Sequence, residues 1–299
     1  MTTLQRPRAA GQAPGFYRFK LGAYEAIALH DGVAVRERPA GFVRNASDAE
    51  VGEAYAAAGM ARDKLTLTYN ALAIRTAGGT VLIDTGLGEG GLANGAGQID
   101  ANLAAAGLSR AAISTVIISH FHSDHIAGLL RADGRAAFPN AEILVPEKEW
   151  AFWRDEARMN AAPDWMKPHF ALAKRIFDPL ATSVRRYGWG EEVLPGFTSV
   201  KAGGHTPGMA AIEIVSGDSA TMFVADITNN PLVFARHPDW QALFDLDPEE
   251  ATATRKALLD RAAADKLRLS FFHAPFPATG YVIKAGAGYE YVPALWGAG

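Results

Sequence analysis

The sequence predicts a mixed α/β fold, and two observations support this. Apolar, β-branched runs fall into two groups along the chain, and helix-like segments follow each group. Several runs end on a histidine or an aspartate, and sites in α/β folds commonly lie at strand ends. With 299 residues and 49% hydrophobic content, the chain can bury a large core. We therefore expect an N-terminal tail over residues 1–15 and a single domain over residues 16–299.

The expected elements of the N-terminal half are three strands and two helices. Ala77-Gly78-Gly79 joins the first two strands and predicts a hairpin, and Pro146 suits the first turn of the second helix. The strands are expected at residues 65–76, 80–85 and 114–119, and the helices at residues 98–106 and 147–158.

The C-terminal half has a similar order of elements. Ser216-Gly217-Asp218-Ser219 predicts a second hairpin, and Asp247 is a candidate N-cap for a long helix. Strands are expected at residues 197–201, 209–214, 220–224 and 267–272, and the helix at residues 248–264.

The segment His120-Phe121-His122-Ser123-Asp124-His125 places three imidazoles and a carboxylate directly after an expected strand. Imidazole and carboxylate suit zinc and similar divalent ions. In an extended chain His120 and His122 project to the same side. If the chain then turns into a helix, with Ser123 or Asp124 as N-cap, Asp124 and His125 leave in another direction. The segment therefore predicts two metal ions close together; the alternative is a solvated, histidine-rich loop.

Three further donors stand near the ends of apolar runs, namely His205, Asp226 and His273. Singly, each has an ordinary structural interpretation as a loop histidine, a capping aspartate or a core histidine. Together with the histidine-rich segment, they favour a metal site. The chain contains no cysteine, so every ligand must be a histidine, an aspartate or a glutamate.

This pattern of H-x-H-x-D-H, a distant histidine, an aspartate and a final histidine resembles the metallo-β-lactamase superfamily. The resemblance implies an α+β fold, a four-layered αββα sandwich with metals at one edge between the sheets. One ion would be held by His120, His122 and His205, and the other by Asp124, His125 and His273, with Asp226 bridging them. Residues 81–86 resemble the family's strand that ends in Asp-Thr-Gly, which implies that Asp84 supports the metal loop without binding metal.

Within the superfamily, the chain is similar to the branch that contains methyl parathion hydrolase and related lactonases. Residues 13–18, 28–32, 137–141 and 275–280 carry this similarity. Met209 and Tyr281 depart from it, because the branch usually has histidine at both positions. The substrate pocket is expected to include Leu92, Trp153, Met209 and Tyr281, although a tryptophan is also a common core residue. Residues 86–91 predict either a mobile loop near the site or a long turn.

The expected cofactors are two divalent ions, zinc in the first place, with manganese, iron or cobalt as alternatives. Metal-bound water loses a proton near neutral pH, so a hydroxide bridging the ions is the expected nucleophile. Asp124 is the expected catalytic residue, which orients that hydroxide or moves a proton. The expected substrate is a small neutral, hydrophobic lactone or ester, with organophosphates as promiscuous substrates. The alternative is that an organophosphate triester is the main substrate.

Composition and missing features argue against other classes. The net charge of −3, without a basic stripe, gives no attraction to nucleic acid, so an RNA-processing relative is disfavoured. No apolar run is long enough to cross a bilayer, and no membrane partner is expected. A di-iron oxygen reductase would usually have glutamate in place of His122, and a noncatalytic relative would lack ligands. The N-terminus has no apolar signal region, so a cytoplasmic location is expected, with an exported form lacking its leader as the alternative. The resemblance also suggests a homodimer.

Overall fold

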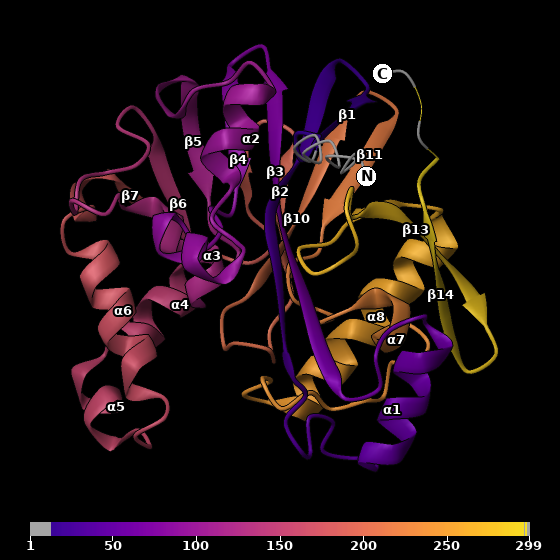
Figure 1. Cartoon of the computed structure of the whole chain (residues 1–299). Helices are drawn as coiled ribbons and strands as arrows, with labels where there is room; N and C mark the ends of the chain where they lie inside the picture. The colour runs from indigo at the N-terminus through magenta and orange to yellow at the C-terminus, as the bar shows by residue number, and fades with distance from the viewer. Residues whose placement is uncertain (1–12, 296, 298–299) are drawn as a thin grey trace, which may run out of the picture.

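The structure is a computed structural model that describes residues 13–295 and 297, so most of the expected tail over residues 1–15 lies outside the described part. Within those residues, the chain forms two seven-stranded mixed sheets that face each other, with helices packed outside them (Figure 1). The α+β class that the resemblance implied is therefore confirmed.

The N-terminal sheet has its strands in sequence order. Its first four strands pair antiparallel and the last four pair parallel, with β4 belonging to both sets. The strands are β1 (Phe16–Leu21), β2 (Tyr24–Glu37), β3 (Lys64–Thr76), β4 (Gly79–Ile83), β5 (Ile113–Ile117), β6 (Glu142–Pro146) and β7 (Val184–Tyr187).

The C-terminal sheet also follows the chain, and its only parallel pair among the described strands is β11 with β12. Its strands are β8 (Glu192–Leu194), β9 (Phe197–Lys201), β10 (Ala210–Ser216), β11 (Ser219–Phe223), β12 (Arg268–Ser270), β13 (Thr279–Ala285) and β14 (Gly288–Pro293).

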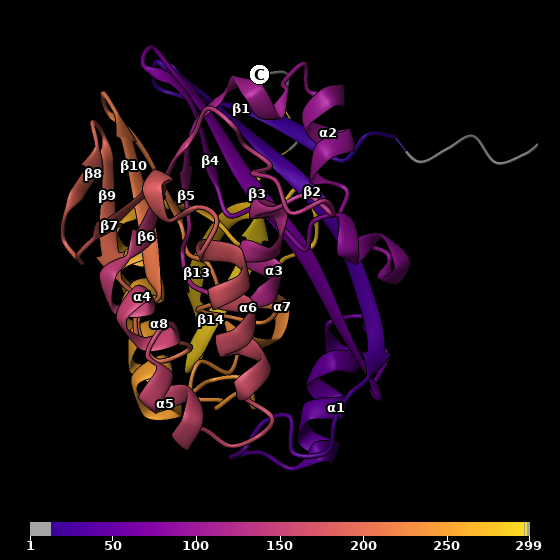
Figure 2. The ribbon, with the colours of Figure 1, turned by 90° about the vertical axis from the view of Figure 1, so that its left-hand side faces the viewer.

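The helices connect and cover the strands. Figure 2 shows α4 next to β6, and α5 and α6 pack against α4. The helices are α1 (Asp48–Ala57), α2 (Ile99–Ala105), α3 (Ser123–Ile126), α4 (Glu147–Trp153), α5 (Glu156–Ala161), α6 (Lys167–Phe177), α7 (Pro231–Phe234) and α8 (Pro248–Asp265). Short 3₁₀ helices cover Glu89–Asn94, Arg110–Ala112, Ala127–Leu129 and Ala181–Ser183.

Successive side chains of the N-terminal strands lie alternately in two separate hydrophobic cores. On β2, Ala26 and Ala28 face a core that they share with the second sheet, including Ile212 and Phe223. Ile27 and Leu29 are in the other core, which includes residues of α2, α4 and α6. Successive side chains of a strand point to opposite faces, so a strand buried on both faces reads as a continuous apolar run. This is the four-layered arrangement that the resemblance implied.

Several predicted local features are present. The hairpins β3–β4 and β10–β11 are formed, and the side chain of Asp247 accepts a hydrogen bond from the backbone N–H of Glu250 at the start of α8. Two expectations were wrong. The helix expected over residues 147–158 is two helices, because α4 ends at Trp153 and Asp155 caps α5. The N-cap of α3 is His122, so Ser123 and Asp124 lie inside its first turn.

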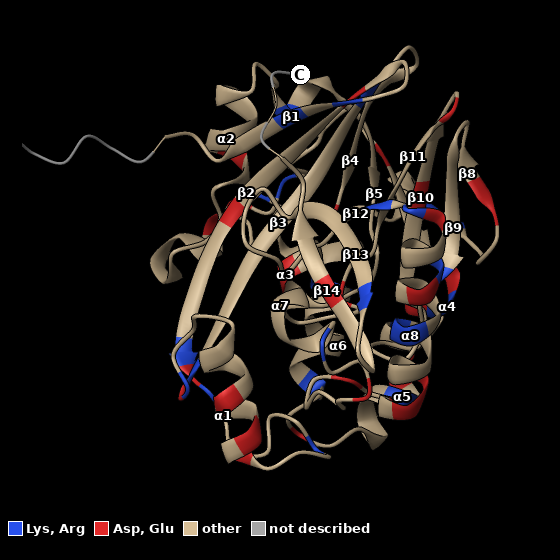
Figure 3. Cartoon of the chain, turned by 90° about the vertical axis from the view of Figure 1, so that its right-hand side faces the viewer, with Lys and Arg blue, Asp and Glu red and all other residues tan. Residues whose placement is uncertain are grey.

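Basic and acidic residues alternate along the ribbon in the view that contains α1 and α8 (Figure 3). Along α8, Glu249 and Glu250 are followed by Arg255, Lys256 and Asp260. None of the helices formed by residues 13–295 combines the length and the apolar character needed to span a membrane.

Candidate metal centre

The predicted ligands converge because strand ends meet at one edge of each sheet. In the N-terminal sheet β4 and β5 are parallel, and Ile83 pairs with Ile117, so Asp84 and the segment from His120 leave the sheet side by side. In the C-terminal sheet β11 and β12 are parallel, and Phe223 pairs with Ser270, which brings Asp226 near His273. Parallel strands place their carboxyl ends at the same edge, where sites form in α/β sheets.

The first group of donors consists of His120, His122 and His205. Nδ1 of His122 lies 3.1 Å from Nε2 of His120 and 2.9 Å from Nε2 of His205. His205 comes from the loop between β9 and β10, so this group joins the two sheets. Its three nitrogen atoms point at one common position.

The second group consists of Asp124, His125, Asp226 and His273. Nε2 of His125 lies 3.6 Å from Oδ2 of Asp124 and 3.2 Å from Oδ1 of Asp226. Nε2 of His273 lies 3.4 Å from Oδ2 of Asp124 and 3.0 Å from Oδ2 of Asp226. One carboxylate and one imidazole from each sheet therefore meet here.

Asp226 lies between the two groups. Its Oδ2 atom is 3.0 Å from Nε2 of His273 and 3.3 Å from Nε2 of His205. The groups also touch through the rings of His120 and His125, whose centroids are 3.9 Å apart. Ala225, directly before Asp226, has a φ of 45°, a left-handed conformation that is uncommon for a residue with a side chain. The strand thus ends in a sharp bend that turns Asp226 toward both groups.

Most of these imidazoles have a second partner on the ring nitrogen that points away from the donor group. Nδ1 of His125 lies 2.7 Å from Oδ2 of Asp84, and Nδ1 of His273 lies 2.8 Å from the carbonyl oxygen of Thr68. Such partners hold the ring orientation and the tautomer of metal-binding histidines. Asp84 also accepts hydrogen bonds from the backbone N–H and the hydroxyl of Ser119. Asp84 therefore contacts the segment that carries His120 and His125.

Two of these partners were not predicted from the sequence. Nδ1 of His205 lies 2.9 Å from Oδ1 of Asp245, and Nδ1 of His120 lies 3.1 Å from Oγ of Ser119. Asp245 is forty positions from His205 in a loop before α8, and no local pattern relates the two. Ser119 precedes the first histidine directly, so its position beside the motif was the available signal.

The buried carboxylates hold protons on the surrounding imidazoles. Burial alone lowers the pKa of His205, but hydrogen bonds with Asp226 and Asp245 outweigh it and raise the pKa to about 9. Burial also lowers the pKa of His273, but the negative charges of Asp226 and Asp124 and hydrogen bonds with them outweigh it and raise this pKa to about 10. His120 has the opposite behaviour, because burial and the neighbouring His125 hold its pKa well below the ordinary value. Without a metal, the site therefore carries protons where a cation would bind.

The donor set fits a pair of divalent ions. Nε2 of His125 and Oδ1 of Asp226 are buried and lie 3.2 Å apart, but neither atom makes a well-aligned hydrogen bond among the described residues. Buried polar atoms without partners are rare in folded proteins and call for a ligand. In the first group, Nδ1 of His122 lies about 3 Å from Nε2 of His120 and from Nε2 of His205, a spacing compatible with ligands around one ion with bonds of about 2 Å. Nitrogen and oxygen donors without sulfur suit zinc, manganese, iron and cobalt.

Two aromatic rings, of Trp153 and His169, lie beside His122, and the buried Glu149 is hydrogen-bonded to Trp153. Of these three residues, the sequence predicted only Trp153. The ring of Trp153 lies 6.2 Å from that of His122, and the ring of His169 on α6 lies 5.7 Å from it. Glu149 on α4 is fully buried and accepts a hydrogen bond from Nε1 of Trp153 at 2.8 Å. Glu149 stands in the charged run Glu147-Lys148-Glu149 at the start of α4, so nothing local marks it as buried, and His169 is an isolated histidine without a motif.

The four expected pocket residues differ in burial and in their contacts with the donor groups. Trp153 is buried beside His122, and Met209 is buried in the core between the sheets. Leu92, in the 3₁₀ helix Glu89–Asn94, is 60% exposed, and Tyr281, on β13, is 39% exposed. Among the described residues, no hydrogen bond or ring contact joins Leu92, Met209 or Tyr281 to the donor groups.

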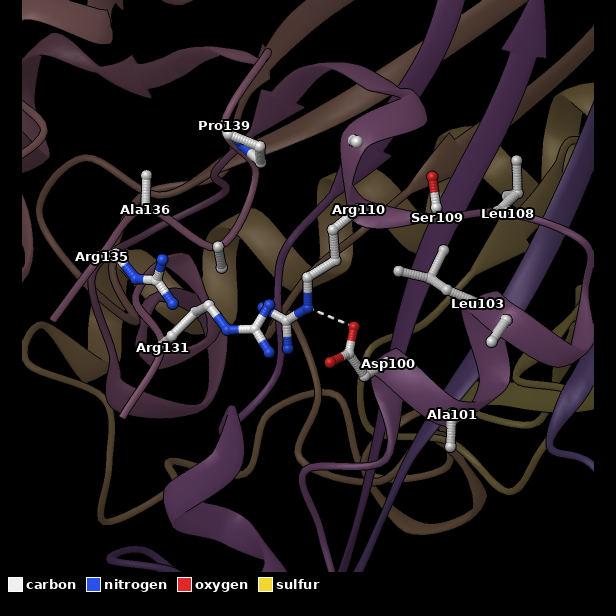
Figure 4. A pocket seen from close by; sticks show the side chains of 13 residues that line it. Asp100, Ala101, Leu103, Leu108, Ser109, Arg110, Arg131, Arg135, Ala136 and Pro139 are labelled. Atoms are coloured by element: carbon white, nitrogen blue, oxygen red, sulfur yellow. Dashed lines mark hydrogen bonds and ion pairs between the residues drawn. The ribbon is translucent and has the colours of Figure 1, made fainter. Parts of the chain in front are cut away.

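A cavity of about 820 Å³ lies away from the donor groups, between α2 and the segment of residues 131–139 (Figure 4). Three arginines line it, and each pairs with an acidic residue. Arg110 pairs with Asp100, as Figure 4 shows. The other two pairs are Arg131 with Glu89 and Arg135 with Asp133. The positive charges are thus balanced locally, and the cavity is separate from the candidate metal centre.

Comparisons with known proteins agree with this geometry. The sequence profile of the Metallo-beta-lactamase superfamily matches residues 66–273. No curated protein sequence matches the chain. Among solved structures, the chain is similar to AidC, a dizinc quorum-quenching lactonase in complex with a product, with 29% identity, a TM-score of 0.88, and coverage of 95% of this chain and 99% of AidC.

Two other solved structures show the same architecture. Hydrolase AbOPH of the beta lactamase superfamily is 25% identical, with a TM-score of 0.87 and coverage of 96% of this chain and 100% of AbOPH. A probable metal-dependent hydrolase from Staphylococcus aureus is 22% identical, with a TM-score of 0.75 and coverage of 93% and 100%, and this likeness concerns the fold alone. Because the family profile spans more than half of the chain and the neighbours cover nearly all of it, this chain belongs to the metallo-β-lactamase superfamily and is a metal-dependent hydrolase.

Proposed function

We propose that this protein is a binuclear hydrolase that opens a neutral, hydrophobic lactone or cleaves a related ester. The observation that carries the proposal is the arrangement of two donor groups around one shared carboxylate, Asp226. Two divalent ions held there would lower the pKa of water to supply a nucleophile and would polarise the carbonyl oxygen of the substrate.

We assign the ligands by the two groups. His120, His122 and His205 hold one ion; Asp124, His125 and His273 hold the other; and Asp226 contributes to both. Zinc is the proposed metal, because the donors are imidazole and carboxylate and because the similar protein AidC is a dizinc enzyme. Asp84, Ser119, Asp245 and the carbonyl group of Thr68 keep the rings in the orientation that binding needs.

Asp124 is the proposed catalytic residue. The side chain of Asp124 is 18% exposed, whereas those of Asp226 and His273 are 3% exposed. Solvent and substrate therefore reach Asp124 more easily than these two residues. The positive charges of His125 and His273, with a hydrogen bond from His273, overcome burial and lower the pKa of Asp124 to about 2. As a carboxylate, it can accept a proton from the attacking water and pass it to the leaving oxygen of the lactone.

The lactone class is supported by the neighbours and by the wall of the site. AidC is a lactonase that was solved with a homoserine product, and at 29% identity it is similar to this chain over nearly the full length of both. The half-buried ring of His169 lies beside His122 and the buried Trp153, and its ring surface favours contact with an apolar acyl group over an anionic sugar or phosphate.

A substrate panel tests this proposal directly. The zinc-loaded protein is assayed with an N-acyl-homoserine lactone, an aromatic lactone, an aryl ester and methyl parathion, and kcat/KM values are compared. We expect a lactone to exceed the other substrates by at least about tenfold, a difference of about 1.4 kcal/mol in transition-state stabilisation. If methyl parathion leads, the protein belongs functionally with the phosphotriesterases, and the lactonase proposal fails. No hydrolysis of any member would contradict both.

Two further expectations remain proposals. Residues 16–299 act as one domain, which the core shared by both sheets supports. The protein is a homodimer, which light scattering at several concentrations would test against a monomer of 31.8 kDa.

A further inference from the structure

The buried carboxylate of Glu149 joins three segments of the chain at the candidate metal centre. Its Oε2 atom accepts hydrogen bonds from the backbone N–H of Phe121 at 3.0 Å and from Nε1 of Trp153 at 2.8 Å. Its Oε1 atom accepts one from the backbone N–H of Gly208 at 2.6 Å. The side chain is fully buried, no ion pair joins it to a basic side chain among the described residues, and the hydroxyl of Thr206, in the same turn as Gly208, lies beside it. Both oxygens are therefore committed to donors of the chain itself.

The three donors lie next to the same group of imidazoles. Phe121 stands between His120 and His122, and Gly208 stands three positions after His205 in the same turn. The third donor, Trp153, has its ring beside that of His122. Glu149 thus connects the N-terminal sheet's metal loop, the C-terminal sheet's histidine turn and the wall next to them.

The geometry of Gly208 shows how close this connection is. A Cβ atom on Gly208 would lie 2.4 Å from the backbone nitrogen of Glu149, so only glycine permits this approach. The turn after His205 therefore rests directly on the first residues of α4. Movement of α4 relative to this turn would move His205.

His122 differs from the other two histidines of its group, because no side chain is hydrogen-bonded to its outward-facing ring nitrogen among the described residues. In the first donor group, His120 has Ser119 and His205 has Asp245 as partners for the outward-facing ring nitrogen. Across the described residues, no side chain plays this part for His122, whose Nδ1 faces the other two rings. Its orientation depends instead on the preceding backbone at Phe121 and on the ring of Trp153, and both are hydrogen-bonded to Glu149.

We infer that Glu149 is the positioning residue of the three-histidine group, and that it sets the metal affinity of this group but not that of the group around Asp124 and His273. The inference rests on the proposed function, because it requires that both groups bind metal. Asp84 has the corresponding position for the second group, through its contact with His125. Residues that orient ligands typically change metal affinity by about 10- to 100-fold when replaced.

The test uses the full chain with Glu149→Gln, which keeps the size of the side chain but turns one acceptor into a donor. The amide NH₂ must then face an N–H group, so at least one of the three hydrogen bonds is lost. The control is Glu147→Gln on the same helix, where Glu147 pairs with Arg186 at 3.3 Å and is 51% exposed. If Glu149→Gln does not fold, Glu149→Asp is used, because it keeps the charge and only shortens the reach.

Cobalt(II) is titrated into the metal-free protein. Binding is measured by the number of ions bound per chain and by the paramagnetically shifted NMR resonances of the N–H groups of the ligating imidazoles. We expect Glu149→Gln to keep one cobalt at the wild-type affinity and to bind the second about 10- to 100-fold more weakly. The resonances of the three-histidine group should be lost first, while Glu147→Gln behaves like the wild type.

Three other outcomes are distinguishable. If both ions bind to Glu149→Gln with wild-type affinity, the inference is overturned. Equal weakening of both ions would also overturn it, since a general structural role does not select one group. If the wild-type chain binds no cobalt, the proposed function fails, whatever Glu149 does.

Discussion

Oδ1 of Asp245 lies 2.9 Å from Nδ1 of His205, and both side chains are almost completely buried. Oδ2 of the same aspartate lies 3.5 Å from Nη2 of Arg255 on α8. The buried guanidinium of Arg255 also donates to the backbone carbonyl groups of Ile227, Pro238 and Trp240. A histidine of the candidate metal centre is therefore held through one carboxylate by a buried arginine of a helix.

We expect Asp245→Asn to destabilise the protein before any metal is added. The amide could still accept a hydrogen bond from His205, but the buried Arg255 would lose its ion pair with Asp245. Breaking a buried pair in this way costs about 3–5 kcal/mol. Denaturant unfolding of the metal-free protein measures this cost. Glu53→Gln, which removes an exposed partner of Arg62, is the control and should change the unfolding free energy by about 1 kcal/mol or less. Equal effects of the two substitutions would contradict the assigned role of Asp245.

Asp124→Ala should reduce turnover more than it reduces metal content. The substitution removes one of four donors of the second group, while Asp226, His125 and His273 remain. Loss of proton transfer typically lowers kcat by about 10²- to 10⁴-fold. Steady-state kinetics at saturating zinc, combined with elemental analysis of the same sample, provides the measurement. A rate near that of the wild type with both ions present would rule out the catalytic role of Asp124.

His205→Ala and His273→Ala should each reduce the metal content of the protein, because they remove a ligand from different groups. We expect close to one ion per chain after dialysis against a weak chelator, compared with two in the wild type. His237→Ala is a suitable control, since His237 stacks on Trp240 at 4.1 Å and belongs to neither group. Full metal content in both variants, measured by elemental analysis, would show that the ligand assignment is wrong.

Metal uptake should release protons and become stronger as the pH rises. In the metal-free protein the pKa of His205 is raised to about 9 and that of His273 to about 10, so both imidazoles hold protons at pH 8. A metal must displace these protons, and at least two should be released per chain at pH 8, because nearby aspartates also raise the pKa of His125. The apparent affinity therefore falls as the pH drops below 9 and levels off above about 10. Calorimetric titration in buffers of different ionisation enthalpy measures the proton count, and a count of zero would contradict this prediction.

The candidate ligands could be predicted from the sequence because most of their signal is local. Four of the seven lie within six consecutive residues, and His205, Asp226 and His273 follow apolar runs that form β9, β11 and β12. The hairpins and the cap at Asp247 were predicted for the same reason, since turn residues and capping residues act on their immediate neighbours. The break between α4 and α5 was missed, because the cap at Asp155 competes with an otherwise helical pattern.

The contacts that orient the ligands were decided only by the tertiary structure. Asp245 reaches His205 across forty positions, Glu149 reaches Gly208 across 59, and His169 lies beside His122 from another helix. Such pairs leave no periodic trace in the sequence, because they depend on how two sheets and their helices pack. By itself, the sequence determined which donors are available and that they stand at strand ends. The pairing of β4 with β5 and of β11 with β12 then decided where these ends meet, because parallel neighbours deliver their carboxyl ends to one edge.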